Sequence, residues 1–118
     1  MKGMRQFWNE QADWSERTFG IERGPVGPMK HLRKEVDEVL ERLEAQTPSL
    51  DCFYSREELL EEFADCLFLL FDATRRAKFG FKDLVRAAFK KLAKNKTRIW
   101  PTPTKGDEPI EHERGIND

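Results

Sequence analysis

The sequence predicts an all-α fold: a bundle of four to five helices that associates into an oligomer and carries a mostly extended C-terminal tail. Apolar residues recur at helical spacing in successive segments, whereas no segment alternates apolar and polar residues over the length of a strand. Proline and glycine stand between these segments, where they end helices. The chain of 118 residues fits one domain, close to the size at which association often supplies further buried surface. We expect residues 1–100 to form this domain and residues 101–118 to form the tail.

The first expected helix covers residues 6–18, and Gly20 can supply the left-handed turn that ends it. Its helical spacing is carried by Phe7, Trp8, Gln11, Trp14 and Arg17. Residues 24–28, Gly-Pro-Val-Gly-Pro, predict an ordered loop because they break any helix. Just after this loop, an amphipathic helix is expected from Met29 to about Ala45, before Pro48. Its apolar stripe consists of Leu32, Val36, Val39, Leu40 and Leu43.

Two further helices are expected in the second half of the chain. Ser55 and Glu58 have the spacing of a capping box, which predicts a helix from about residue 55 to about Lys78. Apolar residues return to helical spacing over residues 81–97, which predicts the fourth helix. Trp100-Pro101 ends it.

Composition and charge argue against several classes of protein. The 21 lysines and arginines nearly cancel the 22 acidic residues, so no overall field favours a nucleic-acid polymer or an anionic membrane. The longest apolar run, Cys66 to Phe71, is far shorter than a membrane span, and the N-terminus lacks the apolar segment of a secretory signal. Cys52 and Cys66 are too few for a disulfide framework or a structural zinc site, and Cys66 is expected in the core. We therefore expect a cytoplasmic protein.

The acidic side chains of the third helix need an explanation, because beyond Phe63 this helix is otherwise nearly apolar. At about 100° per residue, four carboxylates fall on one ridge that has apolar residues on both flanks. They are Glu58, Glu62, Asp65 and Asp72. Carboxylates bounded by apolar surface are unfavourable unless cations neutralise them. The ridge therefore indicates a cation site.

The second helix offers a matching pair of carboxylates. Glu35 and Glu38 are three residues apart and share a row with His31 and Arg42. If the apolar stripes of the two helices pack antiparallel, four carboxylates converge on one oxygen-rich site. They are Glu35, Glu38, Glu62 and Asp65. The natural occupant of such a site is Mg²⁺, for which Mn²⁺ can substitute, and these ions bind phosphate oxygens readily.

The fourth helix offers the complementary charge near its end. Lys91, Asn95 and Arg98 continue an apolar row and are expected to turn inward, with Lys94 nearby. Lysine provides a point charge, arginine a planar fork for two phosphate oxygens, and asparagine a donor and an acceptor for a sugar or base. This row suits a triphosphate, although cations at a helix C-terminus also simply favour the helix dipole.

Each signal alone has a structural alternative, so the combination carries the argument. Trp8 and Trp14 can be core residues instead of stacking on a base, and His31 can be a surface or capping histidine. An alternative from another class is a non-catalytic helical interaction module whose acidic ridge pairs with basic residues of a partner; dependence on metal would separate the two. A di-iron bundle is disfavoured because neither His31 nor His112 lies three residues after a glutamate.

Taken together, these motifs resemble the MazG-like all-α nucleoside triphosphate pyrophosphohydrolases. The signature of that family is Glu-Glu-x-x-Glu, a variable gap and Glu-x-x-Asp. Its four metal positions match Glu35, Glu38, Glu62 and Asp65, whereas Lys34 replaces the leading glutamate, whose role cannot be carried over. Four segments are similar to the phage and bacterial dATP/dGTP pyrophosphohydrolase branch: residues 24–28, 31–35, 72–76 and 109–112.

The resemblance implies an enzyme that converts a purine deoxynucleoside triphosphate, dGTP or dATP, to the monophosphate and pyrophosphate. In phage members this reaction can feed the synthesis of 2-aminoadenine nucleotides. Mg²⁺ ions held by the four carboxylates would bridge the triphosphate, and Glu38 would orient the attacking water. The residues expected to contact the substrate are Lys91, Lys94, Asn95, Arg98, His31 and Trp14. Asp72 is either a structural partner of Arg75 or Arg76 or a contact to the nucleotide sugar. A homodimer or homotetramer is expected.

Overall fold

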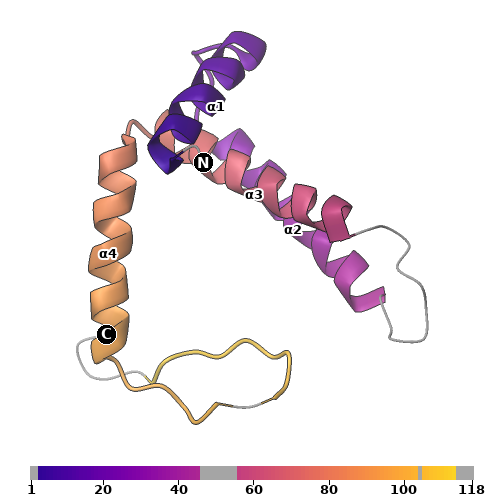
Figure 1. Cartoon of the computed structure of the whole chain (residues 1–118), viewed down its shortest axis with the longest axis vertical. Helices are drawn as coiled ribbons and strands as arrows, with labels where there is room; N and C mark the ends of the chain where they lie inside the picture. The colour runs from indigo at the N-terminus through magenta and orange to yellow at the C-terminus, as the bar shows by residue number, and fades with distance from the viewer. Residues whose placement is uncertain (1–2, 46–55, 104, 114–118) are drawn as a thin grey trace. The chain divides into compact units, whose positions relative to one another are not determined.

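The described part of the chain is mainly helical. A computed structural model describes residues 3–45, 56–103 and 105–113, and within these ranges it contains no strand (Figure 1). Its helices are α1 (Met4–Phe19), α2 (Val26–Ala45), α3 (Arg56–Arg76) and α4 (Phe81–Thr97). The predicted all-α fold is confirmed. None of these helices combines the length and the apolar character that a membrane crossing requires.

The chain divides into two compact units. The first unit ends at Phe81 and contains α1, α2 and α3, whereas the second begins at Lys82 and contains most of α4 and the segment after it. The predicted domain boundary at residue 100 stays a prediction.

The first helix ends where the sequence predicts. Gly20 has φ of 88°, in the left-handed region that favours glycine, and its N–H donates to the carbonyl of Glu16 over 2.9 Å. The backbone then leaves the helix axis, and the chain turns toward α2. The sequence placed the first helix over residues 6–18, and α1 extends slightly beyond both limits.

The start of α2 corrects a prediction. The expected loop over residues 24–28 continues into the helix, because α2 begins at Val26 and includes Gly27 and Pro28. The first turn of a helix leaves its N–H groups without intrahelical acceptors, so the missing N–H of Pro28 costs nothing there. The N–H of Met29 already donates to the carbonyl of Pro25 over 3.3 Å. The predicted helix stop at Pro48 and the predicted cap at Ser55 lie outside the described residues.

The end of α3 comes two residues earlier than the sequence suggests. The helix stops at Arg76, and Lys78 has φ of 74°, a conformation that no α-helix contains. The N–H of Lys78 donates to the carbonyl of Arg75 over 2.9 Å, and that of Phe79 donates to the carbonyl of Thr74 over 3.2 Å. These bonds satisfy carbonyls at the end of α3 and lead directly into α4.

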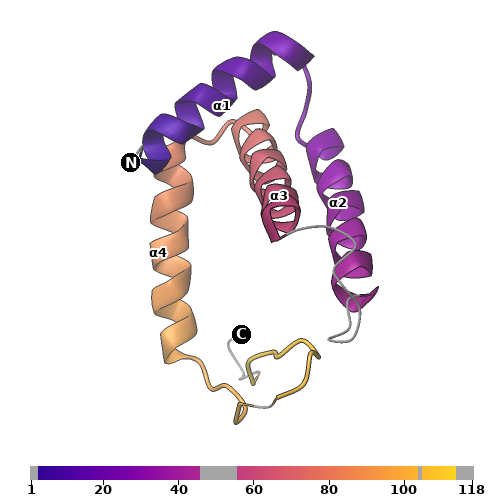
Figure 2. The ribbon, with the colours of Figure 1, turned by 45° about the vertical axis from the view of Figure 1, so that its right-hand side comes forward.

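The core of the first unit forms where α1 and α2 pack on α3. The antiparallel pair of α2 and α3 runs side by side, and α1 packs on α3 as well (Figure 2). Among the buried apolar residues of the described chain are Trp8, Val39, Phe71 and Ala73. The ring of Trp8 lies 4.8 Å from that of Phe71 and 5.6 Å from that of Phe81, centroid to centroid. Trp8 is therefore a core residue, as one of the two sequence-based alternatives proposed.

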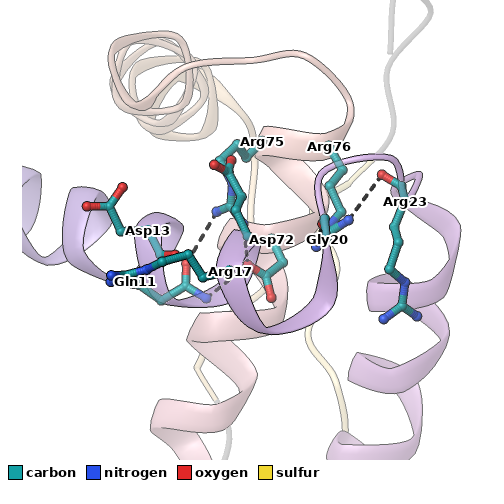
Figure 3. A network of polar contacts seen from close by, with 9 residues as sticks. Gln11, Asp13, Arg17, Gly20, Arg23, Asp72, Arg75 and Arg76 are labelled. Carbon is teal, nitrogen blue, oxygen red and sulfur yellow. Dashed lines mark hydrogen bonds and ion pairs between the residues drawn. The ribbon is translucent and has the colours of Figure 1, made fainter.

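A buried polar network fixes α1 to the end of α3 (Figure 3). The Gln11 Nε2 donates to Asp72 Oδ1 over 2.9 Å, and Arg75 donates to the same oxygen over 2.7 Å. Arg75 also donates to Gln11 Oε1 over 3.3 Å and to Glu16 Oε1 over 3.0 Å. The three partners of Arg75 satisfy most of its donors, so a charge-assisted network replaces water at this helix contact. Asp72 is thus a partner of Arg75, as one alternative held.

In the second unit, the segment after α4 turns back toward the helix end. The described residues from Pro101 to Glu113 contain neither helix nor strand, and the N–H of Glu113 donates to the carbonyl of Ile99 over 2.7 Å. The rings of Trp100 and His112 lie 5.5 Å apart in an edge contact. The Trp100 Nε1 donates to the carbonyl of Asn95 over 2.7 Å and satisfies one of the last acceptors of α4.

We predict that Arg75→Met destabilises the protein by about 3 kcal/mol, because it leaves the Asp72 carboxylate buried without its cation. Urea unfolding followed by circular dichroism measures this change. The matched control is Arg86→Met, which removes an exposed cation of α4 and is expected to alter stability by less than about 0.5 kcal/mol. Equal stability of the two variants would show that the network does not hold α1 to α3.

Candidate functional site

Three carboxylates meet between α2 and α3. Glu35 comes from α2, whereas Glu62 and Asp65 lie three residues apart on α3 and therefore point to the same side. One oxygen atom of each of these three residues lies within 4.8 Å of the others. The convergence that the sequence suggested for the two acidic pairs thus occurs for three of the four residues.

The electrostatics of Glu35 reflect this crowding. Burial raises the pKa of the Glu35 carboxyl, and the neighbouring charges of Glu38, Glu62 and Asp65 raise it further, against a smaller lowering by His31. A raised pKa means that the folded protein holds the negative charge of Glu35 unfavourably. A cation among the carboxylates would remove that penalty. The electrostatics of the site therefore favour a bound cation.

Neighbouring side chains orient the carboxylates. Arg42 donates to Glu62 Oε1 over 2.6 Å, and the His31 Nε2 lies 3.3 Å from Glu35 Oε1 one helical turn away. Glu38 is half-buried on α2 and close enough to raise the pKa of Glu35, but it is outside the group of three described above. Its predicted roles as metal ligand and as the residue that orients water stay predictions.

Cys66 follows Asp65 on α3 and is half-buried, whereas the sequence placed it in the core. Burial raises the pKa of its thiol, and the charges of Glu35, Asp65 and Glu62 raise it further. This shift disfavours the thiolate, which is the nucleophilic form of cysteine. The oxygen ligands alone define the chemistry of this site.

A cavity of about 360 Å³ begins at the carboxylates and extends toward α1. Glu35, Asp65 and His31 lie at one end. The rest of its wall is mostly apolar and aromatic and includes Trp14, Phe19, Pro28, Phe68 and Leu69. Trp14 is 55% exposed, and its ring lies 5.6 Å from that of Phe19 in an edge contact, so part of this side chain is open to a ligand. The structure thus places His31 and Trp14, both predicted to contact substrate, on the wall of one cavity.

The polar residues of this cavity were not predicted from the sequence as a group. Gln11, Asp72 and Arg76 line it together with Arg23. Arg76 donates to the carbonyl of Arg23 over 3.1 Å and to that of Gly20 over 3.4 Å, which braces the loop between α1 and α2 (Figure 3). The acidic ridge of α3 pointed to Asp72, and Arg76 was one of its two expected partners, whereas Gln11 was noted only for its helical spacing.

The predicted substrate residues of α4 belong to the second unit. Asn95 and Arg98 are half-buried and joined, because Arg98 donates to Asn95 Oδ1 over 3.0 Å. Lys91 and Lys94 are exposed. The approach of these four residues to the triphosphate stays a prediction.

Comparison with known proteins agrees with this geometry. A family model described as dATP/dGTP pyrophosphohydrolase matches residues 7–115. Among solved structures, the chain is similar to a MazG-like pyrophosphohydrolase of cyanophage S-2L, bound to dGDP and three catalytic Mn²⁺ ions per active site. That likeness has a TM-score of 0.62 and 25% identity and covers 97% of this chain and 96% of the other.

A curated relative is the Eaa protein of Salmonella phage P22, 44% identical over 98 residues. The match covers 83% of this chain but only 26% of the Eaa protein, so the chain spans about a quarter of that relative's length. Because the family model covers almost the whole sequence, the chain belongs to the dATP/dGTP pyrophosphohydrolase family, as its acidic motifs indicated.

Proposed function

We propose that this chain is a metal-dependent enzyme that hydrolyses purine deoxynucleoside triphosphates, dGTP or dATP, to the monophosphate and pyrophosphate. The observation that carries the proposal is the cluster of Glu35, Glu62 and Asp65, of which Glu35 and Asp65 line a largely apolar cavity. Cations bound by the carboxylates can bind the phosphates of a nucleotide, and the aromatic side chains of the cavity wall can stack on its base. The dGDP bound to the cyanophage protein supports a purine substrate.

The metal is proposed to be Mg²⁺, with Mn²⁺ able to replace it. The residues fit such ions, because Glu35, Glu62 and Asp65 offer only carboxylate oxygens and the pKa of Glu35 is raised by the negative charge around it. The three Mn²⁺ ions of the cyanophage protein support a divalent metal. Such ions, when bound, supply positive charge to the phosphate oxygens and acidify water.

The remaining side chains of the site take supporting roles in this proposal. Arg42 holds Glu62 in place, and Glu38 orients the attacking water from the next turn of α2. Trp14 stacks on the base with its exposed face, and His31 lies beside the phosphates. Lys91, Lys94, Asn95 and Arg98 are proposed to bind the triphosphate, which rests on the family motifs. The supply of 2-aminoadenine nucleotides is proposed on the same ground, and the cytoplasmic location stays a prediction from the composition of the sequence.

The chain is also proposed to form a homodimer or homotetramer. Val36, Leu40 and Leu43 on α2 and Leu60, Phe63 and Leu70 on α3 are exposed by 39% or more. Apolar residues that recur along a helix pair in this way are typical of an association surface. Light scattering at micromolar concentration is expected to give a mass two or four times that of the 13.9 kDa chain. A monomer with full activity would contradict this prediction.

We predict that the protein releases pyrophosphate and a nucleoside monophosphate from dGTP or dATP in the presence of Mg²⁺ or Mn²⁺, and neither product in EDTA. Chromatography of the products, with each of the four common deoxynucleoside triphosphates in turn, measures the bond that is cleaved. Inorganic phosphate with a diphosphate as products would refute the cleavage position. A protein without any turnover, and indifferent to metal in its stability, would favour the non-catalytic interaction module instead.

We predict that Glu35→Gln and Asp65→Asn each reduce turnover at least about 100-fold, because an amide keeps the shape but loses the charge that holds a hard cation. Glu61→Gln is the matched control: Glu61 neighbours Glu62 on α3 but is exposed and outside the group of three. The control is expected to keep wild-type kcat/KM. Near-normal turnover of either site variant would show that its carboxylate does not bind the metal.

Removal of metal should reveal the repulsion among the carboxylates. The raised pKa of Glu35 means that its protonated form is favoured in the folded state, so this stabilising contribution is lost as the pH rises through that pKa. At neutral pH in EDTA, Glu35→Gln is therefore expected to melt higher than the wild type, and the difference should shrink as the pH falls below the ordinary pKa of glutamate. A thermal melt at both pH values decides this, and a lower melting temperature of Glu35→Gln at neutral pH would contradict the argument.

A further inference from the structure

Asp72 is a polar group of the cavity wall with unused hydrogen-bonding capacity, two helical turns along α3 from Asp65. Asp72 is only 6% exposed, and its Oδ1 accepts hydrogen bonds from both Gln11 and Arg75. Its Oδ2 accepts none from the described residues. Oδ2 is also not one of the fully buried side-chain atoms that lack a hydrogen-bond partner, so it keeps some contact with solvent. Because Asp72 lines the cavity, Oδ2 is the oxygen that a bound ligand can reach.

The orientation of this carboxylate is fixed by its neighbours. Gln11 offers its amide nitrogen to Asp72 and its amide oxygen to Arg75, so a rotated amide would place two acceptors or two donors against each other. Arg75 is held in turn by Glu16. Figure 3 shows Gln11, Asp72 and Arg75 converging at this point. A carboxylate held in one orientation within a cavity is suited to select a ligand by its donors.

Helix α3 sets the distance between this group and the metal-binding end of the cavity. Asp65 and Asp72 are seven residues apart, which is two helical turns, so they lie on the same side of α3 about 10 Å apart along its axis. Phe68 and Leu69 line the cavity between them. The sugar hydroxyl of a nucleotide lies close to its phosphates, whereas the base edge lies at the opposite end. A nucleotide with its phosphates near Asp65 therefore presents its base edge, and not its sugar, to Asp72.

We propose that Asp72 Oδ2 reads the Watson–Crick edge of the base and makes this enzyme select guanine over adenine. Guanine offers two adjacent donors there, its ring N1–H and its 2-amino group, and both match the free lone pairs of one carboxylate oxygen. Adenine offers one amino group beside N1, whose lone pair repels a carboxylate. This inference deepens the proposed function and rests on it.

The proposal can be tested on the wild-type protein with ligands that differ only in their base. Calorimetric binding of dGMP and dAMP, together with kcat/KM for dGTP, dITP and dATP in Mg²⁺, is the measurement. We expect dGMP to bind about 10- to 100-fold more tightly than dAMP, since a hydrogen bond to a charged group strengthens binding by about that factor. Hypoxanthine keeps N1–H but lacks the amino group, so dITP should lie between dGTP and dATP. Equal affinity for dGMP and dAMP would overturn the proposal.

Asp72→Asn tests the residue itself. An asparagine can keep an oxygen toward Gln11 and Arg75 and present its –NH₂ to the base, which repels guanine N1–H and suits the N1 acceptor of adenine. The ratio of dGTP to dATP kcat/KM should therefore fall at least about tenfold. Asp13→Asn is the matched control, because Asp13 is exposed on α1 and does not line the cavity, and the ratio should stay unchanged. If Asp72→Asn does not fold, the dGMP and dAMP affinities of the wild type decide alone.

Other outcomes separate this inference from the function on which it rests. Pyrophosphate release from dGTP and dATP at equal rates would refute base reading by Asp72 and leave the proposed function standing. A loss in Asp72→Asn that is equal for both bases, and absent with 2′,3′-dideoxy-GTP, would assign Asp72 to the sugar hydroxyl and overturn the proposal. Absence of pyrophosphate release from every triphosphate would refute the proposed function, while preferential dGMP binding would still support the assignment of Asp72.

Discussion

The repulsion among the carboxylates between α2 and α3 is the constraint on which the rest of the site depends. Apolar residues on both helices favour their antiparallel packing, but the same packing brings Glu35 against Glu62 and Asp65. The raised pKa of Glu35 expresses the free-energy cost of this arrangement. Arg42 offsets part of that cost at Glu62. A site with this much unbalanced charge beside an apolar seam is stabilised by cations, which makes its metal dependence a property of the packing itself.

Periodicity was enough to predict the helices and the meeting of Glu35, Glu62 and Asp65, because both depend on residues close together in sequence. The carboxylates fall on one ridge of each helix whatever the tertiary structure, so their convergence needed only antiparallel packing of α2 and α3. The start of α2 was misplaced because Pro28 was interpreted as a helix breaker, whereas the first turn tolerates proline. The contact between Gln11 and Asp72 joins residues 61 positions apart, and no local pattern in α1 indicates it.

Helix α1 shows how one amphipathic segment contributes to both the core and the cavity. Trp8 is 5% exposed and packs on Phe71, whereas Trp14 lies on the cavity wall with half of its surface open. The sequence alone could not assign the two indoles, because both have helical spacing and both are large apolar side chains. The network around Arg75 decides their orientation, since it fixes the rotation of α1 on α3 through Gln11 and Glu16.

The same network gives the cavity a rigid far end, which is important for any selective site. Side chains on regular helices hold their positions more precisely than side chains on loops, and a carboxylate with two fixed donors on one oxygen cannot rotate to accommodate a mismatched ligand. In the proposed function, α3 then carries both ends of the substrate: Asp65 on the phosphate side and Asp72 on the base side, two turns apart. A base that fails to match Asp72 therefore also shifts the phosphates relative to the carboxylates, so that selectivity and catalysis are coupled through one helix.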